Sequence, residues 1–221
     1  EVVISSGSIE RPLVFGNNDT PGVLLSSAAK EYMKVYGVLV GKKPIIFTNN
    51  DSAYETAIEF KKNGVDPIVL DSRKELSSDL IKEAKSLGIN IKFEYVVVNA
   101  NGYRKVKSAD IAKISDDKTT LGKIENIACD CICVSGFWTP TIHLASQSGG
   151  KTKFNEEIDA FIPSKSKQNE TTVGSANGIF NLQDSLNTSF EVGYNLSKKI
   201  TKEDNKLSVP TVVEKKNSKH D

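Results

Sequence analysis

The sequence is poor in the residues and patterns that mark most kinds of function. It has one methionine, one tryptophan, two histidines and three cysteines among 221 residues. No run of about 18 apolar residues occurs, and no basic and then apolar signal segment precedes the first predicted strand, so neither a membrane span nor a secretory signal is indicated. The formal net charge of +1 creates no field that would attract nucleic acid or a membrane surface. We therefore expect a cytoplasmic protein that binds neither.

The few cysteines also fail to indicate a metal site. Cys129, Cys131 and Cys133 alternate along an apolar segment, which on a strand would point all three to one face. Zinc sites need Cys-x-x-Cys turns and a second ligand pair, and only His143 and His220 are available. The spacing favours a buried core strand in a reducing compartment and no bound metal.

Glycine is missing from the one turn where a nucleotide fold would need it. Residues 44–71 predict a strand at 45–47, a helix at 53–62 begun by a capping box of Ser52 and Glu55, and a parallel strand at 68–70. Asp71 follows the turn at the distance where a dinucleotide fold places its ribose-binding carboxylate, about 20 residues on. The turn at 49–53 has no glycine for close backbone approach, and Asp51 would repel a pyrophosphate. We expect a structural crossover with Asp71 as a solvated strand end; a nucleotide bound at this turn is the alternative.

The remaining pattern predicts alternating strands and helices. The chain opens on a strand and a small-residue turn at 1–8, which is typical of the middle of a larger protein, and we expect the partner of this strand to lie upstream. Periodicity and glycine stops predict helices at 23–36 and 79–87. Strands are predicted at 91–98, 103–114 and 124–134, the first two joined by a hairpin at Asn101-Gly102. Residues 38–135 thus form a compact β-α-β-α unit followed by a β-meander and a closing strand.

Several motifs together resemble one enzyme family. They are SSGSIERPLVFGNNDTPGV near the start, FTNNDSAY after the first buried strand, and VSGFWTP followed by His143-Leu144 and SQSGGK. With them the chain, from Val2 to about Leu196, resembles the alpha subunits of heterotetrameric sarcosine oxidases. Each motif alone is weak, but the combination is specific.

The resemblance implies an α/β, Rossmann-like FAD/NAD(P)-binding fold whose outer domain is incomplete here. Residues 1–37 and 136–200 would belong to that outer dinucleotide-binding domain, residues 38–135 to a smaller inserted nucleotide-fold domain, and residues 201–221 to a linker. It further implies a subunit that binds NAD and assembles with smaller subunits and a beta subunit carrying FAD, with FMN near the alpha-beta contact. That complex would oxidatively demethylate sarcosine to glycine with oxygen and tetrahydrofolate. The family's G-x-G-x-x-G is not found in this chain.

The same resemblance suggests the cofactor-binding residues. Ser5-Ser6-Gly7 stands where the family has an Ala-Thr-Gly turn, and residues 173–178 stand where related flavoproteins keep a Gly-Asp turn, with Ser175 replacing the acid. That replacement argues against an FAD ribityl contact and is compatible with NAD. Backbone donors before a helix could face a phosphate. The expected contacts are Ser6, Gly7, Gly174, Ser175 and Gly178, with Phe180 and Leu182 as apolar walls.

No residue of this chain is expected to be catalytic. His143 has no partner nucleophile or carboxylate in the pattern, and Trp138 is expected to be buried at a domain or subunit contact. Two alternatives remain open: a non-catalytic nucleotide-fold scaffold for subunit docking, and a subunit of a related amine or imino-acid dehydrogenase. An NAD(P)H-dependent flavin reductase should show a Gly-rich turn in the inserted domain, and this sequence does not.

Overall fold

The computed structural model describes residues 1–117, 119–202, 204 and 207–213. These fall into two compact units, which we call the central unit, residues 10–137, and the terminal unit, residues 1–9 together with 138–213. The first division lies between residues 9 and 10 rather than at the predicted 37/38. The difference arises because residues 23–34 form a strand and a helix of the central unit. Much of the predicted linker, at 203, 205–206 and 214–221, lies outside the described residues.

A five-stranded parallel sheet organises the central unit. Its strands, in spatial order, are β3 (Val23–Leu25), β10 (Cys131–Ser135), β4 (Pro44–Thr48), β5 (Ile68–Asp71) and β6 (Asn90–Phe93). All five residues of β4 and of β10 are buried, as expected of strands covered on both faces. The predicted strand-helix-strand at 44–71 is confirmed, with α2 (Ser52–Lys62) as its crossover.

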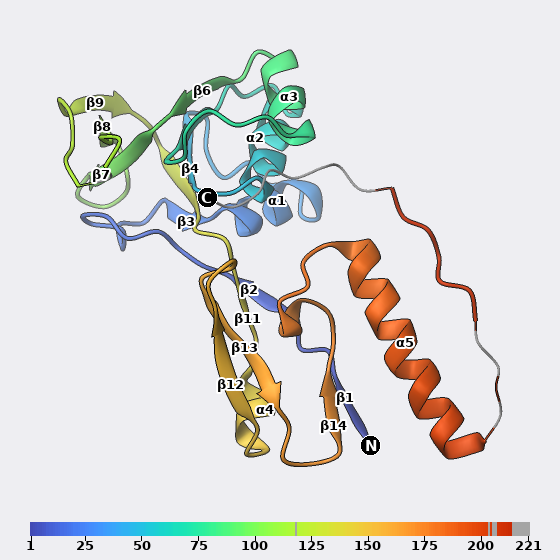
Figure 1. The fold of residues 1–221 in the computed structure, drawn as a ribbon. Coiled ribbons are helices and arrows are strands. Elements are labelled where there is room, and N and C mark those ends of the chain that lie inside the picture. The colour runs from blue at the N-terminus through green and yellow to red at the C-terminus, as the bar shows by residue number, and fades with distance from the viewer. Residues whose placement is uncertain (118, 203, 205–206, 214–221) are drawn as a thin grey trace. The chain divides into compact units, whose positions relative to one another are not determined.

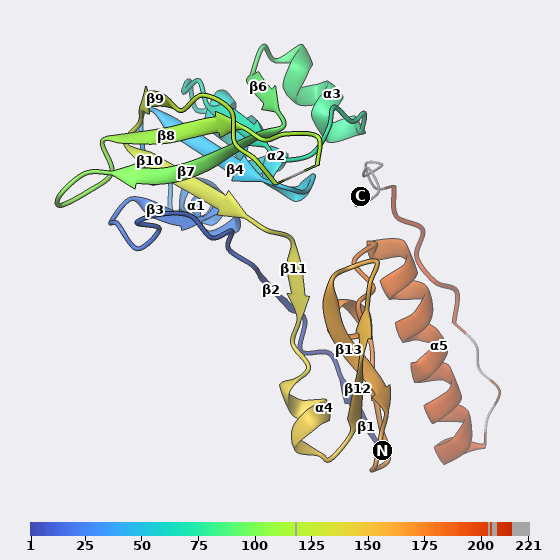
Figure 2. The ribbon, with the colours of Figure 1, turned by 60° about the vertical axis from the view of Figure 1, so that its left-hand side comes forward.

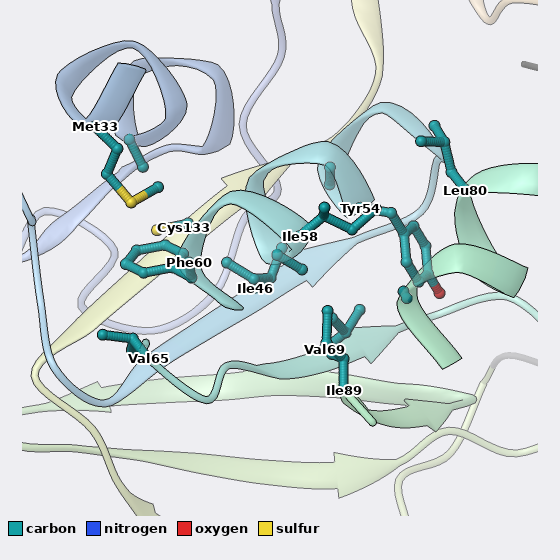
Figure 3. Packing of buried hydrophobic residues seen from close by; sticks show 14 of the residues in the cluster. Met33, Ile46, Tyr54, Ile58, Phe60, Val65, Val69, Leu80, Ile89 and Cys133 are labelled. Atoms are coloured by element: carbon teal, nitrogen blue, oxygen red, sulfur yellow. The ribbon is translucent and has the colours of Figure 1, made fainter. Parts of the chain in front are cut away.

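Helices cover one face of this sheet and a β-meander covers the other (Figures 1 and 2). The helices are α1 (Ser26–Lys34), α2 and α3 (Asp79–Ser86). Figure 3 shows their side chains, among them Met33, Phe60 and Leu80, gathered over Ile46 and Val69 of the sheet. The meander is an antiparallel sheet of β7 (Tyr95–Asn101), β8 (Ser108–Lys113) and β9 (Glu125–Ala128). The predicted pairing of its first two strands is confirmed, but residues 102–107 connect them, so the strand predicted at 103–114 begins only at Ser108.

Three other element predictions in this unit are corrected. The helix predicted at 23–36 starts only at Ser26, because the preceding residues pair with β10. The strand predicted at 91–98 is broken at Glu94, whose φ of 60° ends β6 and begins β7. The strand predicted at 124–134 is two strands, β9 and β10, and this break changes the direction of one cysteine. Cys131 and Cys133 pack under the helices, whereas Cys129 packs with the meander, so the three thiols do not share a face.

The terminal unit contains short strand pairs and one long helix. The strands are β1 (Val2–Ile4), β2 (Ser8–Glu10), β11 (Trp138–Pro140), β12 (Lys151–Asn155), β13 (Ala160–Lys165) and β14 (Glu170–Thr172), paired as β1-β14, β2-β11 and β12-β13. The helices are α4 (His143–Gln147), the short 3-10 helix η1 (Gly174–Asn177) and α5 (Leu182–Thr201). The first strand therefore has a partner in this chain, β14, which the sequence did not indicate. Among the described residues, no helix has both the length and the apolar character needed to cross a membrane.

Candidate functional site

The turn between β4 and α2 lies at the carboxyl edge of the central sheet, where open α/β sheets bind ligands. Asn50 fills this turn. Its Nδ2 donates to the backbone oxygen and the hydroxyl of Ser135, at 3.1 and 2.9 Å, and its Oδ1 accepts from the Ser52 amide at 3.1 Å. The side chain therefore joins the ends of β4 and β10 and caps the start of α2, where a phosphate would approach a glycine turn.

The capping box predicted from Ser52 and Glu55 is wrong. Ser52 is already the first residue of α2, and its hydroxyl donates to Asn50 Oδ1 at 2.6 Å. Glu55 accepts from Lys30 Nζ of α1 at 2.6 Å instead. The residue at the N-cap is Asp51, whose carboxylate is buried beside the helix N-terminus. A carboxylate at this place is favourable for the helix and unfavourable for a bound phosphate.

Asp51 belongs to a buried charge network. Arg73 Nη2 donates to Asp51 Oδ1 at 2.9 Å, and Arg73 Nε and Nη2 donate to the two oxygens of Asp71 at 3.0 and 2.8 Å. The Tyr54 hydroxyl donates to Asp71 Oδ2 at 2.8 Å. Asp71 has no exposed surface, so its description as a solvated strand end is wrong. The carboxylate at the ribose-binding position is instead bound to groups of the protein itself.

The pKa values in the network follow from this geometry. Burial, with the negative charge of Asp71 and its hydrogen bond next, raises the pKa of Tyr54 far above its usual value. Burial works to lower the pKa of Arg73, but its hydrogen bonds and charge contacts with Asp71 and Asp51 outweigh it and raise that pKa. Both groups therefore stay protonated at any ordinary pH. Tyr54 and Arg73 thus act in this network as hydrogen-bond donors to the two carboxylates.

The terminal unit brings together the two turns that the resemblance singled out. β1 and β14 are parallel, and the Val173 amide donates to the Ile4 carbonyl at 2.9 Å as both strands end. After these strands, β1 continues into the turn at Ser6-Gly7 and β14 continues into the turn at Gly174. The carboxyl ends of two parallel strands thus present two glycine turns at one edge, with φ values of 75° at Gly7 and 67° at Gly174.

These turns leave room for a ligand and carry no acid. A Cβ at Gly7 would meet nothing within 4 Å, and one at Gly174 would meet only the Ser185 hydroxyl, at 3.1 Å. Residues 5–7 and 174–177 contain no carboxylate, in contrast to the turn that holds Asp51. The Ser6 hydroxyl donates to the Thr141 carbonyl at 2.7 Å, which fixes its turn against the segment after β11. The open glycine turns suit an anionic cofactor such as a dinucleotide.

The other predicted contacts lie close by in the chain. Ser175 is in η1, and Gly178, with a φ of 77°, ends this helix. Phe180 is half-buried, and Leu182 is 47% exposed at the start of α5. Helix α5 begins at Leu182, where the Asn181 side chain caps it by accepting from the Asp184 amide at 2.9 Å. The backbone amides at Gly174 and Ser175 therefore belong to the short helix η1 and not to the N-terminus of α5.

The remaining singled-out residues show no catalytic arrangement. His143 is the exposed first residue of the short helix α4, and Trp138 is half-buried in β11. The three cysteines are free thiols and buried. In the part of the chain that the structure describes, no cluster of three or more His, Cys, Asp or Glu side chains is placed to hold a metal ion.

Sequence comparison finds relatives that are named as subunits of one oxidase. It is 33% identical over 195 residues to the sarcosine oxidase subunit alpha of Corynebacterium sp. (strain P-1), a match that covers 87% of this chain and 20% of that protein. It is 35% identical over 178 residues to the same subunit of Rhizobium meliloti (strain 1021), covering 80% of this chain and 17% of that protein. The chain is related to the alpha subunit of sarcosine oxidase. The predicted resemblance is confirmed, and the chain spans about a fifth of the length of these relatives. No family model matches the chain.

Solved structures with a similar backbone show the fold class of this chain. T. acidophilum thioredoxin reductase matches with a TM-score of 0.63 at 15% identity, over 82% of this chain and 58% of that one. A flavoprotein disulfide reductase from Escherichia coli matches with a TM-score of 0.65 at 13% identity, over 90% and 44%. L-proline dehydrogenase from P. horikoshii matches with a TM-score of 0.53 at 22% identity, over 96% and 40%. The α/β, Rossmann-like FAD/NAD(P)-binding fold is confirmed.

Sequence reasoning missed the residues that close the central turn. Arg73 lies two positions after the strand that ends in Asp71, and Tyr54 lies on the inner face of α2. A basic residue so close to an acidic strand end was a usable signal for an internal ion pair. The contact of Tyr54 with Asp71 spans 17 residues, and no local pattern indicates it.

Proposed function

We propose that this chain is the central part of an alpha subunit of sarcosine oxidase. The single observation that carries the proposal is the sequence identity of 31–35% to three such subunits over at least 80% of the chain. The complete complex would use a beta subunit carrying FAD, smaller subunits, and FMN at the subunit interface to demethylate sarcosine oxidatively to glycine. Oxygen would accept the electrons and tetrahydrofolate the methylene group. We further propose a cytoplasmic location, which suits three free thiols.

Within this chain we propose that NAD binds at the paired turns of the terminal unit. Ser6 and Gly7 would approach it from β1, and Gly174, Ser175 and Gly178 from β14. Open space at Gly7, positive φ at both glycines and the absence of an acid support this assignment. Phe180 and Leu182 would supply apolar contacts. Bound NAD carries a nicotinamide that can exchange hydride, but the proposal gives it no redox role, and these residues only bind and orient it.

A second candidate function concerns the central unit. The closed turn at Asn50 and Asp51 favours a unit that keeps a nucleotide fold for packing and subunit docking and does not bind a dinucleotide. This reading is compatible with NAD in the terminal unit. If NAD bound to neither unit, the whole chain would be the non-catalytic scaffold.

Calorimetry on the full-length protein tests the cofactor assignment. Gly174→Ala adds a methyl group at the proposed site, and we expect NAD affinity to fall tenfold or more. Gly64→Ala is the matched control, because Gly64 has a similar φ of 76° and open space but lies in the central unit. NAD affinity that is unchanged in Gly174→Ala, at equal folded fraction, would remove the assignment.

The oxidase assignment needs a separate test. The full-length protein, coexpressed with the subunits of its complex, should consume oxygen when sarcosine is added. A complex that oxidises proline or another imino acid and leaves sarcosine untouched would instead favour a related dehydrogenase.

A further inference from the structure

The connection between β7 and β8 is an exposed loop with a strongly basic sequence. We call residues 102–107, Gly-Tyr-Arg-Lys-Val-Lys, the basic loop, and Figure 2 shows it extending beyond the ends of the two strands. Arg104, Lys105 and Lys107 are exposed, and within the part of the chain that the structure describes no carboxylate pairs with any of them. The Tyr103 side chain is 94% exposed. The basic loop thus presents three unpaired cations and an aromatic ring to solvent.

The backbone of the basic loop is held in place at its base. Val106 is 1% exposed and packs in the core between the meander and the central sheet, and its amide donates to the Pro21 carbonyl at 2.9 Å. At Gly102 the φ is 154°, and a Cβ would lie 1.9 Å from the Lys105 carbonyl oxygen, so only glycine fits there. Residues 103–105 therefore project from a fixed base, and a partner that binds them needs to order little backbone.

The sheet surface beside the basic loop is polar and carries little charge. Asn101 pairs with Ser108 where the loop leaves the meander, and Asn99 Nδ2 donates to Asn101 Oδ1 at 2.8 Å. The nearby carboxylate of Asp110 already accepts from Asn126 Nδ2 at 2.7 Å. Protein interfaces commonly combine an aromatic and arginine centre with a polar rim that stays in contact with water. The basic loop and the surface beside it have this arrangement.

Charge and size indicate the class of partner. Unpaired cations attract a surface of opposite charge, which speeds association and fixes the orientation of the two partners. Strong nucleic-acid binders neutralise about 6–10 phosphates, and anionic lipid surfaces are recognised by clusters of about 4–8 lysines and arginines. The basic loop has three cations, on a chain whose net charge is +1. A small acidic patch on a folded protein therefore matches it better than nucleic acid or a membrane does.

We propose that the basic loop docks this chain onto an acidic surface of a partner subunit. The Tyr103 ring would fill a pocket of that subunit, and Arg104, Lys105 and Lys107 would face its carboxylates. The inference rests on the proposed function, because it needs the partner subunits of the oxidase. It assigns a docking role to the central unit and does not depend on NAD in the terminal unit.

Binding of the full-length protein to immobilised partner subunits tests the docking role. At about 0.15 M NaCl, Tyr103→Ala should weaken the affinity about tenfold or more, because a buried aromatic anchor is lost. The double variant Arg104→Glu/Lys105→Glu should weaken it at least as much, because like charges then face each other. Lys123→Glu is the matched control and should bind as the wild type does. Lys123 is also exposed and unpaired among the described residues, but it lies at the opposite end of the meander.

The outcomes separate the docking role from the oxidase assignment. Wild-type binding with unchanged affinity in both loop variants would overturn the docking role and leave the oxidase assignment in place. A loss in Tyr36→Ala without a loss in Tyr103→Ala would equally overturn it, because Tyr36 is 64% exposed just after α1 and far from the basic loop in sequence. A wild-type protein that binds no partner subunit would remove the oxidase assignment together with the docking role.

A DNA duplex is the probe for the other class of partner. The wild type should not bind it at about 0.15 M NaCl. A duplex that binds the wild type and not Arg104→Glu/Lys105→Glu, while both proteins bind the partner subunits equally, would assign the basic loop to nucleic acid and overturn the proposal.

Discussion

Arg73 binds Asp71 through both of its carboxylate oxygens, with nitrogen-oxygen distances of 3.0 and 2.8 Å. Both side chains are buried, at 6% and 0% exposure. The same guanidinium reaches Asp51 at the start of α2. One arginine therefore binds both the carboxylate at the end of β5 and the carboxylate at the N-terminus of the crossover helix. The central unit therefore has the strand-helix-strand of a nucleotide fold, but the two carboxylates at its carboxyl edge bind an arginine of the protein itself.

Removal of the arginine should destabilise the central unit strongly. Arg73→Met leaves two buried carboxylates without their cation, and breaking a buried pair in this way costs about 3–5 kcal/mol. Urea unfolding of the full-length protein measures the change. Lys85→Met breaks an exposed pair with Glu75 and should cost no more than about 1 kcal/mol. Equal losses of unfolding free energy in the two variants would show that the buried network contributes no more to stability than an exposed ion pair.

Tyr54 should make stability sensitive to alkaline pH. Its pKa is raised in the folded protein, chiefly by burial and then by Asp71, so the unfolded chain loses this proton first. Stability from this group is complete below the usual tyrosine pKa of about 10 and decreases as the pH rises above it. Urea unfolding at pH 8 and pH 11 should show a steeper loss in the wild type than in Tyr54→Phe. At pH 8, Tyr54→Phe should itself cost about 1–3 kcal/mol, because Asp71 loses a donor. Parallel pH profiles for the two proteins would contradict this role.

The cysteines should be unreactive in the folded protein. Burial raises the pKa of Cys129 to about 12, and the contact with Cys131 together with burial raises the pKa of Cys133. Iodoacetamide at pH 8 should therefore modify none of the three thiols until urea unfolds the central unit, when all three should react. Mass spectrometry locates the label. Rapid modification of Cys129 under native conditions would show that the strand break before β10 opens to solvent.

Gly178 should tolerate a side chain less well than Gly7. Both have positive φ, at 77° and 75°, so alanine is strained at each by about 1 kcal/mol. At Gly178 the added Cβ would also lie 3.0 Å from Ile162, whereas at Gly7 it meets nothing within 4 Å. Thermal unfolding should show a loss for Gly178→Ala that exceeds the loss for Gly7→Ala by about 1–3 kcal/mol. The reverse order would mean that the turn at Gly7 is more tightly packed than the structure shows.

The sequence predicted elements well where local pattern and burial agree. The apolar run of β4, the period of α2 and the glycine after α3 each determine their own element, and all three are where the pattern put them. The predictions are wrong where a tertiary contact determines the secondary structure. Val23–Leu25 would continue the pattern of α1, but its residues pair with β10, more than 100 positions away.

The same reason explains what could be predicted of the sites. The lack of glycine at 49–53 predicts a turn that binds no nucleotide, which stays a prediction. Asp71 was misplaced because its partners Tyr54 and Arg73 depend on the fold. The proximity of the turns after β1 and β14 depends on a strand pairing across most of the chain, and only the resemblance brought them together. The break between β6 and β7 at Glu94 was not foreseen, because a positive φ at a glutamate has no sequence signature.

We propose that the terminal unit, and not the central turn, holds the dinucleotide. Amide hydrogen exchange of the full-length protein with and without NAD reports on both places in one experiment. We predict that NAD slows exchange in peptides covering residues 5–8 and 173–178 and leaves residues 48–53 unchanged. Protection confined to residues 48–53, with none at the paired glycine turns, would show that NAD binds the central unit instead.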